Sequence, residues 1–290
     1  AVCDSCSQNV LGAFSCKGRG FCPSCCTRRM EDTSEHIVET ILPDVPIRQW
    51  VLSLPYQLRP MVAFQASLFA AVIRIFMSEV FRYLRTKALN AGIERPLCGG
   101  IAFLQRFGSS MNLNPHIHAI LLDGVYRHVK RSDHQIEPEL DFHPIAPPTP
   151  KEIEQVSFRV CRRVIRLLER RGLANADGLI PSEARAPEQA VQEAAARVFP
   201  LFAHVDDGLV HPIQQRSSYE RSAEVRGFST HAAVFAPDGD KAGRRRIVRY
   251  CVRPLFAEKQ LSPTRDGRVA FELRHPPSSG ATHVVMSELG

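Results

Sequence analysis

The sequence predicts an α+β protein in which a small N-terminal zinc-ribbon-like module with four cysteine ligands precedes a larger domain with a central antiparallel sheet. Three observations lead to this prediction. Cysteines crowd the N-terminus, runs with strand periodicity alternate with runs of helical periodicity, and two strand-like runs flank a short polar connection. We expect the module at residues 1–32 and the larger domain at 45–290, with helices on one face of the sheet and a helical insertion at about 150–200.

The N-terminal segment contains the spacing of a metal site. Six of the nine cysteines lie in the first 26 residues, and two Cys-x2-Cys pairs are formed by Cys3, Cys6, Cys22 and Cys25. This spacing is typical of a tetrahedral zinc site, and four thiolates leave no open position for water. We therefore predict a structural Zn²⁺ held by these four residues. Cys16 or Cys26 could replace a neighbour as ligand.

The first half of the larger domain contains a strand, a helix and a hairpin. The run IRQWVLSLP predicts a strand that ends at Pro55, and residues 61–91 carry apolar side chains at helical spacing up to Gly92. Residues 100–107 and 116–125 have strand character on either side of GSSMNLNP. These two runs therefore predict an antiparallel hairpin.

The second half begins with the proline-rich segment 143–150, which precedes a predicted helix at 151–171. One face of this helix is basic, because it carries Arg159, Arg162, Arg163, Arg166 and Arg170. Such a face either binds a polyanion or is simply solvated. After the rest of the insertion, the predicted order is a strand at 226–235, a Pro-Asp-Gly turn, a helix at 241–252, and strands near 269–273 and 282–286.

Composition favours a polyanionic partner. The 290 residues carry a formal net charge of +7, for which solubility alone is the alternative explanation. The clustered cysteines argue against a disulfide framework, and no apolar run has the length of a membrane span or the form of a signal peptide. We expect a cytoplasmic, nucleoid-associated bacterial protein, and both ends of the chain look trimmed.

A His-x-His pair lies in the second strand of the predicted hairpin. Alternate side chains share one face of a strand, so His116 and His118 point the same way while Ile117 points to the opposite, buried side. Two imidazoles on one face can bind one divalent metal, although ordinary sheet-face histidines are the alternative. Gln105 shares its face with Phe103 and Ile101 and could add a carbonyl oxygen as a third ligand; a purely structural glutamine is the alternative.

The helix predicted at 241–252 carries a tyrosine among arginines. In RRRIVRYCVRP, Arg246 lies four residues before Tyr250 and Arg253 three after it, so these side chains share a helical face. A phenol is a weak nucleophile until cations or a metal stabilise its anion. The alternative is a tyrosine whose ring packs on the helix surface. We predict that DNA phosphates are contacted by Arg246, Arg249, Arg253, Lys17 and Arg19.

Several long motifs together resemble the HUH transposases of rolling-circle insertion sequences, the family usually numbered ninety-one, which includes the common-region elements. The motifs are CKGRGFCPSC, RQWVLSLP, FLQRFGSSMNLNPHIHAILLDGV and RYCVRP. The resemblance implies a ferredoxin-like or RRM-like sheet on which His116 and His118 hold Mg²⁺ or Mn²⁺. It also implies that Tyr250 attacks single-stranded DNA at transposon ends, forming a 5′-phosphotyrosine and freeing a 3′-hydroxyl.

Some members of that family carry two active tyrosines one helical turn apart. Here the position four after Tyr250 is Pro254, so the sequence matches the single-tyrosine variant. A mechanism that holds two DNA ends on one subunit would then need Tyr219, Tyr126 or a second protomer, and a homo-oligomer is compatible with the sequence.

Three alternatives stay open at the level of the sequence. A plasmid or phage replication initiator, or a relaxase, would use the same chemistry, and a decayed transposase would bind DNA without catalysis. A zinc hydrolase built on His116 and His118 is disfavoured, because Asp123 has the opposite strand parity and no other carboxylate has a recognisable spacing.

Overall fold

The computed structural model describes residues 23–108, 112–129, 140–174, 221–254, 260–273 and 280–286. These residues form a mixed α+β structure with antiparallel sheets, as the sequence predicts. The main sheet has the strand order β2-β3-β1-β7-β6, and β8 also pairs with β1. Its strands are β1 (Ile47–Ser53), β2 (Gly100–Phe107), β3 (Leu113–Leu122), β6 (Ser222–Val225), β7 (Phe228–His231) and β8 (Phe235–Ala236).

The predicted hairpin is confirmed, and β3 lies inside the sheet. Strand β3 pairs with β2 on one side and with β1 on the other, antiparallel in both cases. The ladder between β2 and β3 shifts register between Gln105 and Phe107. Strand β3 begins three residues before the predicted start at 116, and Gly124 and Val125 belong to β4 instead.

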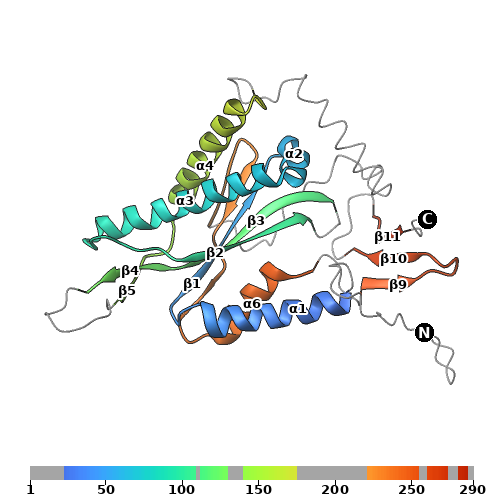
Figure 1. Ribbon diagram of the computed structural model, residues 1–290, viewed down its shortest axis with the longest axis horizontal. Helices are drawn as coiled ribbons and strands as arrows, with labels where there is room; N and C mark the ends of the chain where they lie inside the picture. The colour runs from blue at the N-terminus through green and yellow to red at the C-terminus, as the bar shows by residue number, and fades with distance from the viewer. Residues whose placement is uncertain are drawn as a thin grey trace.

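Helices cover both faces of this sheet, not one as the sequence predicted (Figure 1). Trp50 and Ile117 face the core that contains α3 (Ala66–Asn90) and α4 (Pro150–Arg170). Ile120 faces a second core that contains α6 (Lys241–Val252). The physical reason is that the side chains of β1 and β3 are buried on both faces, and a strand buried on both faces needs a layer on each.

The helix predicted at 61–91 is interrupted. Gln65 has extended backbone angles, so the segment divides into α2 (Arg59–Phe64) and α3, after the 3₁₀ turn η2 (Tyr56–Leu58). Helix α3 ends before Gly92, which has φ +81° and thus the left-handed conformation that stops a helix without strain. No single helix in the described part of the chain is long and apolar enough to cross a membrane; the bent pair Tyr56–Phe64 and Ala66–Asn90 passes by length and composition only.

Helix α4 belongs to the core and does not merely decorate it. Thr149 and Glu152 form a capping box at its start, and the side chain of Thr149 accepts a hydrogen bond from the Glu152 backbone. The buried stripe of α4 then packs into the α3 core through Ile153, Val156, Val160, Val164 and Leu168. The remainder of the expected insertion, residues 175–200, lies outside the described residues.

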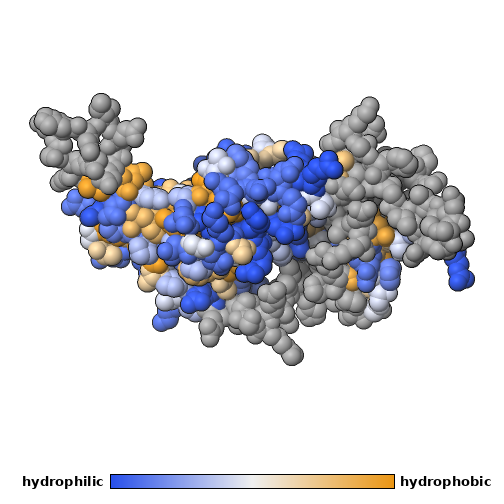
Figure 2. Space-filling model, turned by 90° about the horizontal axis from the view of Figure 1, so that it is seen from below, coloured by the Kyte–Doolittle hydropathy of each residue, from blue (hydrophilic) through white to orange (hydrophobic). Residues whose placement is uncertain are grey.

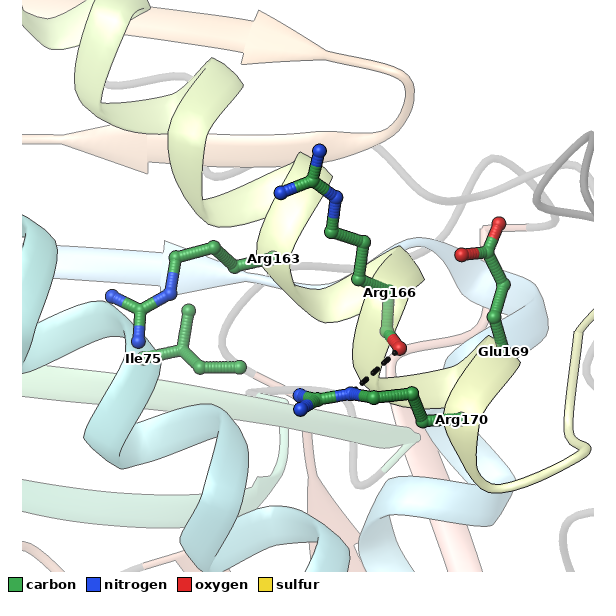
Figure 3. A pocket seen from close by; sticks show the side chains of 5 residues that line it. All are labelled: Ile75, Arg163, Arg166, Glu169 and Arg170. Atoms are coloured by element: carbon green, nitrogen blue, oxygen red, sulfur yellow. Dashed lines mark hydrogen bonds between the residues drawn. The ribbon is translucent and has the colours of Figure 1, made fainter.

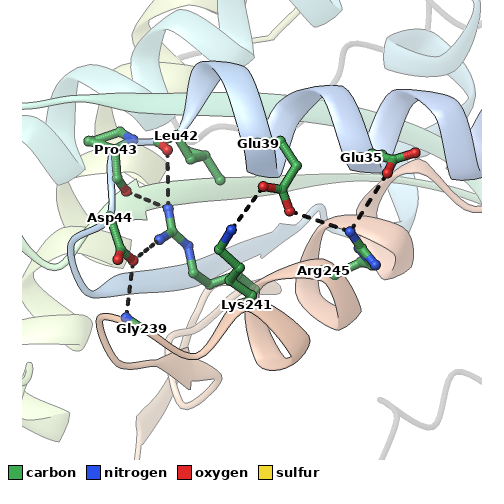
Figure 4. Close-up of polar contacts among 9 residues, drawn as sticks. Glu35, Glu39, Leu42, Pro43, Asp44, Gly239, Lys241 and Arg245 are labelled. Carbon is green, nitrogen blue, oxygen red and sulfur yellow. Dashed lines mark hydrogen bonds and ion pairs between the residues drawn. The ribbon is translucent and has the colours of Figure 1, made fainter.

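Helix α1 (Pro23–His36) was not predicted, and it packs beside α6 through complementary charges (Figure 4). It continues as the π-helical segment η1 (Ile37–Ile41). Lys241 and Arg245 of α6 form ion pairs with Glu39, at 3.1 and 3.4 Å between nitrogen and oxygen. The buried Arg244 donates to the carbonyl oxygens of Leu42 and Pro43 and to the carboxylate of Asp44. Seen from below, the described surface over this layer is mostly hydrophilic (Figure 2).

Two smaller sheets complete the described residues. Strands β4 (Gly124–His128) and β5 (Leu140–Pro144) form one, and β9 (Leu261–Pro263), β10 (Val269–Glu272) and β11 (His283–Met286) form the other. The strands predicted near 269–273 and 282–286 are thus confirmed, whereas β5 and β9 were not predicted.

Candidate active site

The two histidines stand side by side on the α6 face of β3. His116 lies opposite Ser53 and Gln105, while His118 lies opposite Val51 and Phe103. Their ring centroids are 4.8 Å apart, and their exposures are 7% and 2%. The alternation of β3 therefore places them on one face, with Ile117 in the opposite core, as the sequence predicts.

Both imidazoles are uncharged at neutral pH. Burial lowers the pKa of His118 to about 3, and Coulombic repulsion from the His116 ring when it is protonated and from Arg253 adds to this shift. Burial also lowers the pKa of His116; the Asn114 carbonyl opposes this shift, and the charges of Arg253 and Arg59 add to it. A neutral imidazole has a lone pair, and this is the form that binds metals.

The hydrogen bonds of the two rings differ. Nδ1 of His116 lies 2.6 Å from the carbonyl oxygen of Asn114, which can only accept, so Nδ1 carries the proton and Nε2 has the lone pair. Nε2 of His118 is buried and has no hydrogen-bond partner among the described residues. A buried ring nitrogen without a partner in the protein is suited to an external ligand.

Tyr250 lies on α6, the helix that covers the histidine face of the sheet, and its ring lies against this pair. Asp240 caps α6 by accepting a hydrogen bond from the Gly243 backbone, and the helix has the bounds that the sequence predicts. The ring of Tyr250 is 5.3 Å from that of His118, at 90°, and Tyr250 is 37% exposed. The guanidinium carbon of Arg253 lies 4.5 Å from the centre of the tyrosine ring. Histidines, tyrosine and arginine, distant in the sequence, thus meet at one place.

Gln105 lies beside the pair and contacts α6. Its amide nitrogen donates to the carbonyl oxygens of Tyr250 at 3.2 Å and Cys251 at 3.0 Å. The last carbonyls of a helix have no partner within the helix, so this amide satisfies two of them and ties β2 to the tyrosine helix. Phe103 and Ile101 share its face and pack into the same core, as predicted.

Gln49 of β1 is a site residue that the sequence reasoning missed. It is 3% exposed, and its amide nitrogen lies 3.1 Å from Nδ1 of His118 and 3.1 Å from Sγ of Cys251. Burial raises the pKa of Cys251 to about 12, so this thiol keeps its proton. The strand parity of Gln49 follows from IRQWVLS, but the sequence does not say which strand lies beside β1.

Arg59 of α2 was also missed. It is 6% exposed, its Nε donates to the Leu54 carbonyl oxygen at 3.1 Å, and its buried Nη1 has no hydrogen-bond partner within the described part of the chain. Desolvation lowers its pKa, and its charge in turn acts on His116. A buried cation whose donor has no acceptor favours an anionic ligand.

The residues predicted to bind DNA divide into three groups. Arg253 lies in the site, and Arg246 is exposed on α6. Arg249 is engaged by Glu31 of α1, with 2.5 Å between nitrogen and oxygen. Lys17 and Arg19 lie outside the described residues. The same holds for residues that belong to other predictions, namely Cys3, Cys6, Cys16, Cys22 and Tyr219.

The remaining predicted residues have the following positions. Cys25 and Cys26 are half-buried in the first turns of α1, so the zinc ligand set stays a prediction. Tyr126 lies on β4 and packs on Phe142, with 5.2 Å between ring centroids. Asp123 forms a buried ion pair with Arg48 at 2.7 Å. In the described part of the chain, no three side chains among His, Cys, Asp and Glu lie close enough together to hold a metal.

A basic pocket lies on the opposite side of the sheet, between α3 and α4 (Figure 3). Its lining contains Ile75, Arg163, Arg166, Glu169 and Arg170. Arg163 is neutralised by the buried Glu79, at 2.6 Å. Among the described residues, Arg166 and Arg170 have no carboxylate within ion-pair distance.

Comparison with known families identifies two families that match this chain. The family model described as "Putative transposase" (Y2_Tnp) matches residues 99–289, which include β3 and α6. The model described as "Transposase zinc-binding domain" (Zn_Tnp_IS91) matches residues 1–54. No curated protein and no solved structure matches the chain. The resemblance to insertion-sequence transposases is thereby confirmed, and the chain belongs to this transposase family, with a transposase zinc-binding domain at its N-terminus.

Proposed function

We propose that this protein is an HUH-type tyrosine transposase that nicks and rejoins single-stranded DNA at transposon ends during rolling-circle transposition. One observation carries the proposal: the ring of Tyr250 lies 5.3 Å from that of His118, whose buried Nε2 has no partner in the part of the chain that the structure describes. A nucleophile, a vacant ligand atom and the cation Arg253 converge there. This combination is what a metal-assisted attack on phosphorus needs.

His116 and His118 would hold Mg²⁺ or Mn²⁺. The donor set fits, because both rings are neutral and the Nδ1 proton of His116 is held by a backbone carbonyl, which leaves its Nε2 as the donor. Gln105 would add its carbonyl oxygen as a third ligand while its amide nitrogen holds α6. Oxygen ligands suit these hard cations. When bound, the metal supplies Lewis acidity at a phosphate oxygen.

The covalent step would proceed from Tyr250. Its phenol loses a proton, its oxygen forms a bond to phosphorus, and the bond from phosphorus to the 3′-oxygen breaks. The 3′-oxygen takes up a proton and becomes a free hydroxyl, while the 5′-phosphate stays on the tyrosine. Arg253 would stabilise the negative charge of the phenolate and of the phosphate. Attack by a 3′-hydroxyl on the phosphotyrosine reverses the step and joins strands without ATP.

The finer features that the resemblance implies belong to the same proposal. The main sheet would be the ferredoxin-like or RRM-like palm of the enzyme, and Tyr250 would act as its single tyrosine. The N-terminal domain would hold a structural Zn²⁺ through Cys3, Cys6, Cys22 and Cys25, and Lys17 and Arg19 would contact DNA phosphates.

The alternatives fit less well. A replication initiator or relaxase would share the chemistry, but the family match and the zinc-binding domain support a transposase. A zinc hydrolase would need a general base, and Asp123 is not free for that role because its carboxylate is occupied by Arg48. A DNA-binding remnant does not account for the convergence of His116, His118 and Tyr250.

The test is covalent capture of DNA. The protein is incubated with Mn²⁺ and labelled single-stranded DNA that carries the element's end, and the mixture is separated on a denaturing gel. We expect a metal-dependent protein–DNA adduct that disappears in Tyr250→Phe and persists in Tyr126→Phe, the matched control on β4. Binding of a verified substrate without an adduct would instead identify a DNA-binding remnant.

A further inference from the structure

We propose that Gln49 is a positioning residue that holds His118 in the tautomer with the proton on Nδ1, so that the buried Nε2 is the metal donor. The inference deepens the proposed function and rests on it for the role of the metal. Gln49 comes from β1, whereas the predicted ligands come from β2 and β3.

The position of Gln49 follows from the strand register. Gln49 lies opposite Ile120 and Val51 lies opposite His118, so Gln49 shares the face of His118 and lies diagonal to it. Its amide nitrogen is 3.1 Å from Nδ1 of His118 and 3.1 Å from Sγ of Cys251. Since Gln49 is 3% exposed, water does not compete for the amide.

Two hydrogen-bond arrangements fit these positions, because a half-turn of the amide exchanges its nitrogen and oxygen. In the first, the amide nitrogen donates to an unprotonated Nδ1, and the ring proton is on Nε2. In the second, the amide oxygen accepts from Nδ1–H and from the thiol of Cys251, and Nε2 has the lone pair. Both arrangements place the two terminal atoms of the amide at the same two positions, with nitrogen and oxygen exchanged.

The surroundings favour the second arrangement. None of the described residues places an acceptor at Nε2 of His118, so a proton there would be a buried donor without a partner among them. The thiol of Cys251 is protonated and can donate to the amide oxygen. His116 has the same tautomer, because the Asn114 carbonyl holds its Nδ1 proton. The second arrangement thus makes the two rings equivalent donors, as in metal sites whose histidines donate their other N–H to a neighbouring oxygen.

Gln49 also links the two halves of the site. Cys251 follows Tyr250 directly, so one amide contacts both a proposed metal ligand and the nucleophile helix. Gln105 holds the same helix end from the other side of β3. The two glutamines therefore flank the histidine strand and fix α6 above it.

The first test reads the tautomer directly, in the full chain without added Mg²⁺ or Mn²⁺. Long-range proton–nitrogen correlation spectra distinguish a protonated from an unprotonated ring nitrogen. We expect His118 to show protonated Nδ1 and unprotonated Nε2 in the wild type. Gln49→Met should mix the tautomers, whereas Gln49→Glu should restore protonated Nδ1 because a carboxylate accepts the same hydrogen bond. Gln155→Met, on the exposed face of α4, is the matched control and should leave the spectrum unchanged.

The second test titrates Mn²⁺ into the same variants. Loss of a partner behind a metal ligand typically weakens metal binding by about tenfold to hundredfold. We expect that loss for Gln49→Met, with recovery in Gln49→Glu and no change in Gln155→Met. A wild-type spectrum with the proton on Nε2 overturns the inference without any variant. An unchanged tautomer and Mn²⁺ affinity in Gln49→Met overturns it as well.

The inference and the proposed function fail in different experiments. The tautomer is measured without metal or DNA, so it decides the role of Gln49 alone. The Tyr250 adduct decides the transposase chemistry alone. If the protein forms the adduct but its His118 tautomer does not depend on Gln49, the proposed function stands and the inference is wrong.

Discussion

His118 is buried as a neutral ring, and this makes folding dependent on pH. Its pKa is about 3 in the folded protein, against an ordinary value near 6.5. The unfolded chain therefore binds a proton as pH falls below about 6.5, while the folded chain does not. The stabilisation due to the neutral ring is complete above that pH and is lost as pH falls toward the folded pKa. The loss approaches about 1.4 kcal/mol per pH unit once the unfolded ring is mostly protonated, which amounts to roughly 2 kcal/mol between about pH 6.5 and 4.5.

Urea unfolding at a series of pH values measures this loss. The wild type should lose roughly 2 kcal/mol more free energy of unfolding than His118→Gln over that window, because the glutamine does not titrate. The zinc-binding segment and all other titrating groups are common to both proteins, so the difference isolates His118. His128→Gln, on the exposed end of β4, is the control and should run parallel to the wild type. Parallel curves for the wild type and His118→Gln would refute the reasoning.

Three further predictions concern arginines. Arg249→Gln should lower the free energy of unfolding by less than about 1 kcal/mol, because the ion pair of Arg249 is half-exposed. Arg244 is buried, so Arg244→Met should lower the free energy of unfolding by about 2 kcal/mol or more. Equal losses for the two variants in urea unfolding would contradict this prediction. Arg166→Gln combined with Arg170→Gln should reduce the slope of log affinity for duplex DNA against log salt by about 1.8; an unchanged slope would mean a solvated face. Arg59→Met should slow adduct formation by about tenfold or more, measured against Tyr126→Phe; an unchanged rate would remove Arg59 from the site.

Local periodicity accounts for what the sequence predicted correctly. The strand parity that pairs His116 with His118 depends on a few adjacent residues, and so does the Pro-Asp-Gly turn before α6. Both features emerged with the predicted geometry. The zinc-binding domain was equally visible, because ligand spacing is a property of the chain itself.

The features that the sequence did not predict depend on contacts between distant segments. Gln49 became part of the site only through the pairing of β1 with β3, and no local pattern reveals that neighbour. The position of Arg59 depends on α2, and the sequence did not predict the break at Gln65 that separates α2 from α3 within one apolar run. Helix α1 escaped prediction because a cysteine-rich, charged segment has no clear apolar stripe, and its partners are the cations of α6.

The place of β3 inside the sheet divides the centre into a stiff half and a movable half. Releasing the histidine strand would require breaking two ladders at once, so its amides should be among the slowest to exchange with solvent. Helix α6 shares no strand ladder with the sheet: Ile247, Val248 and Cys251 pack in the second core, and ion pairs and the amides of two glutamines add to this packing, so separating α6 from the sheet breaks side-chain contacts only. In the proposed reaction, a DNA end joined to Tyr250 would therefore travel with a helix, while the pair of imidazoles stays where the sheet holds it.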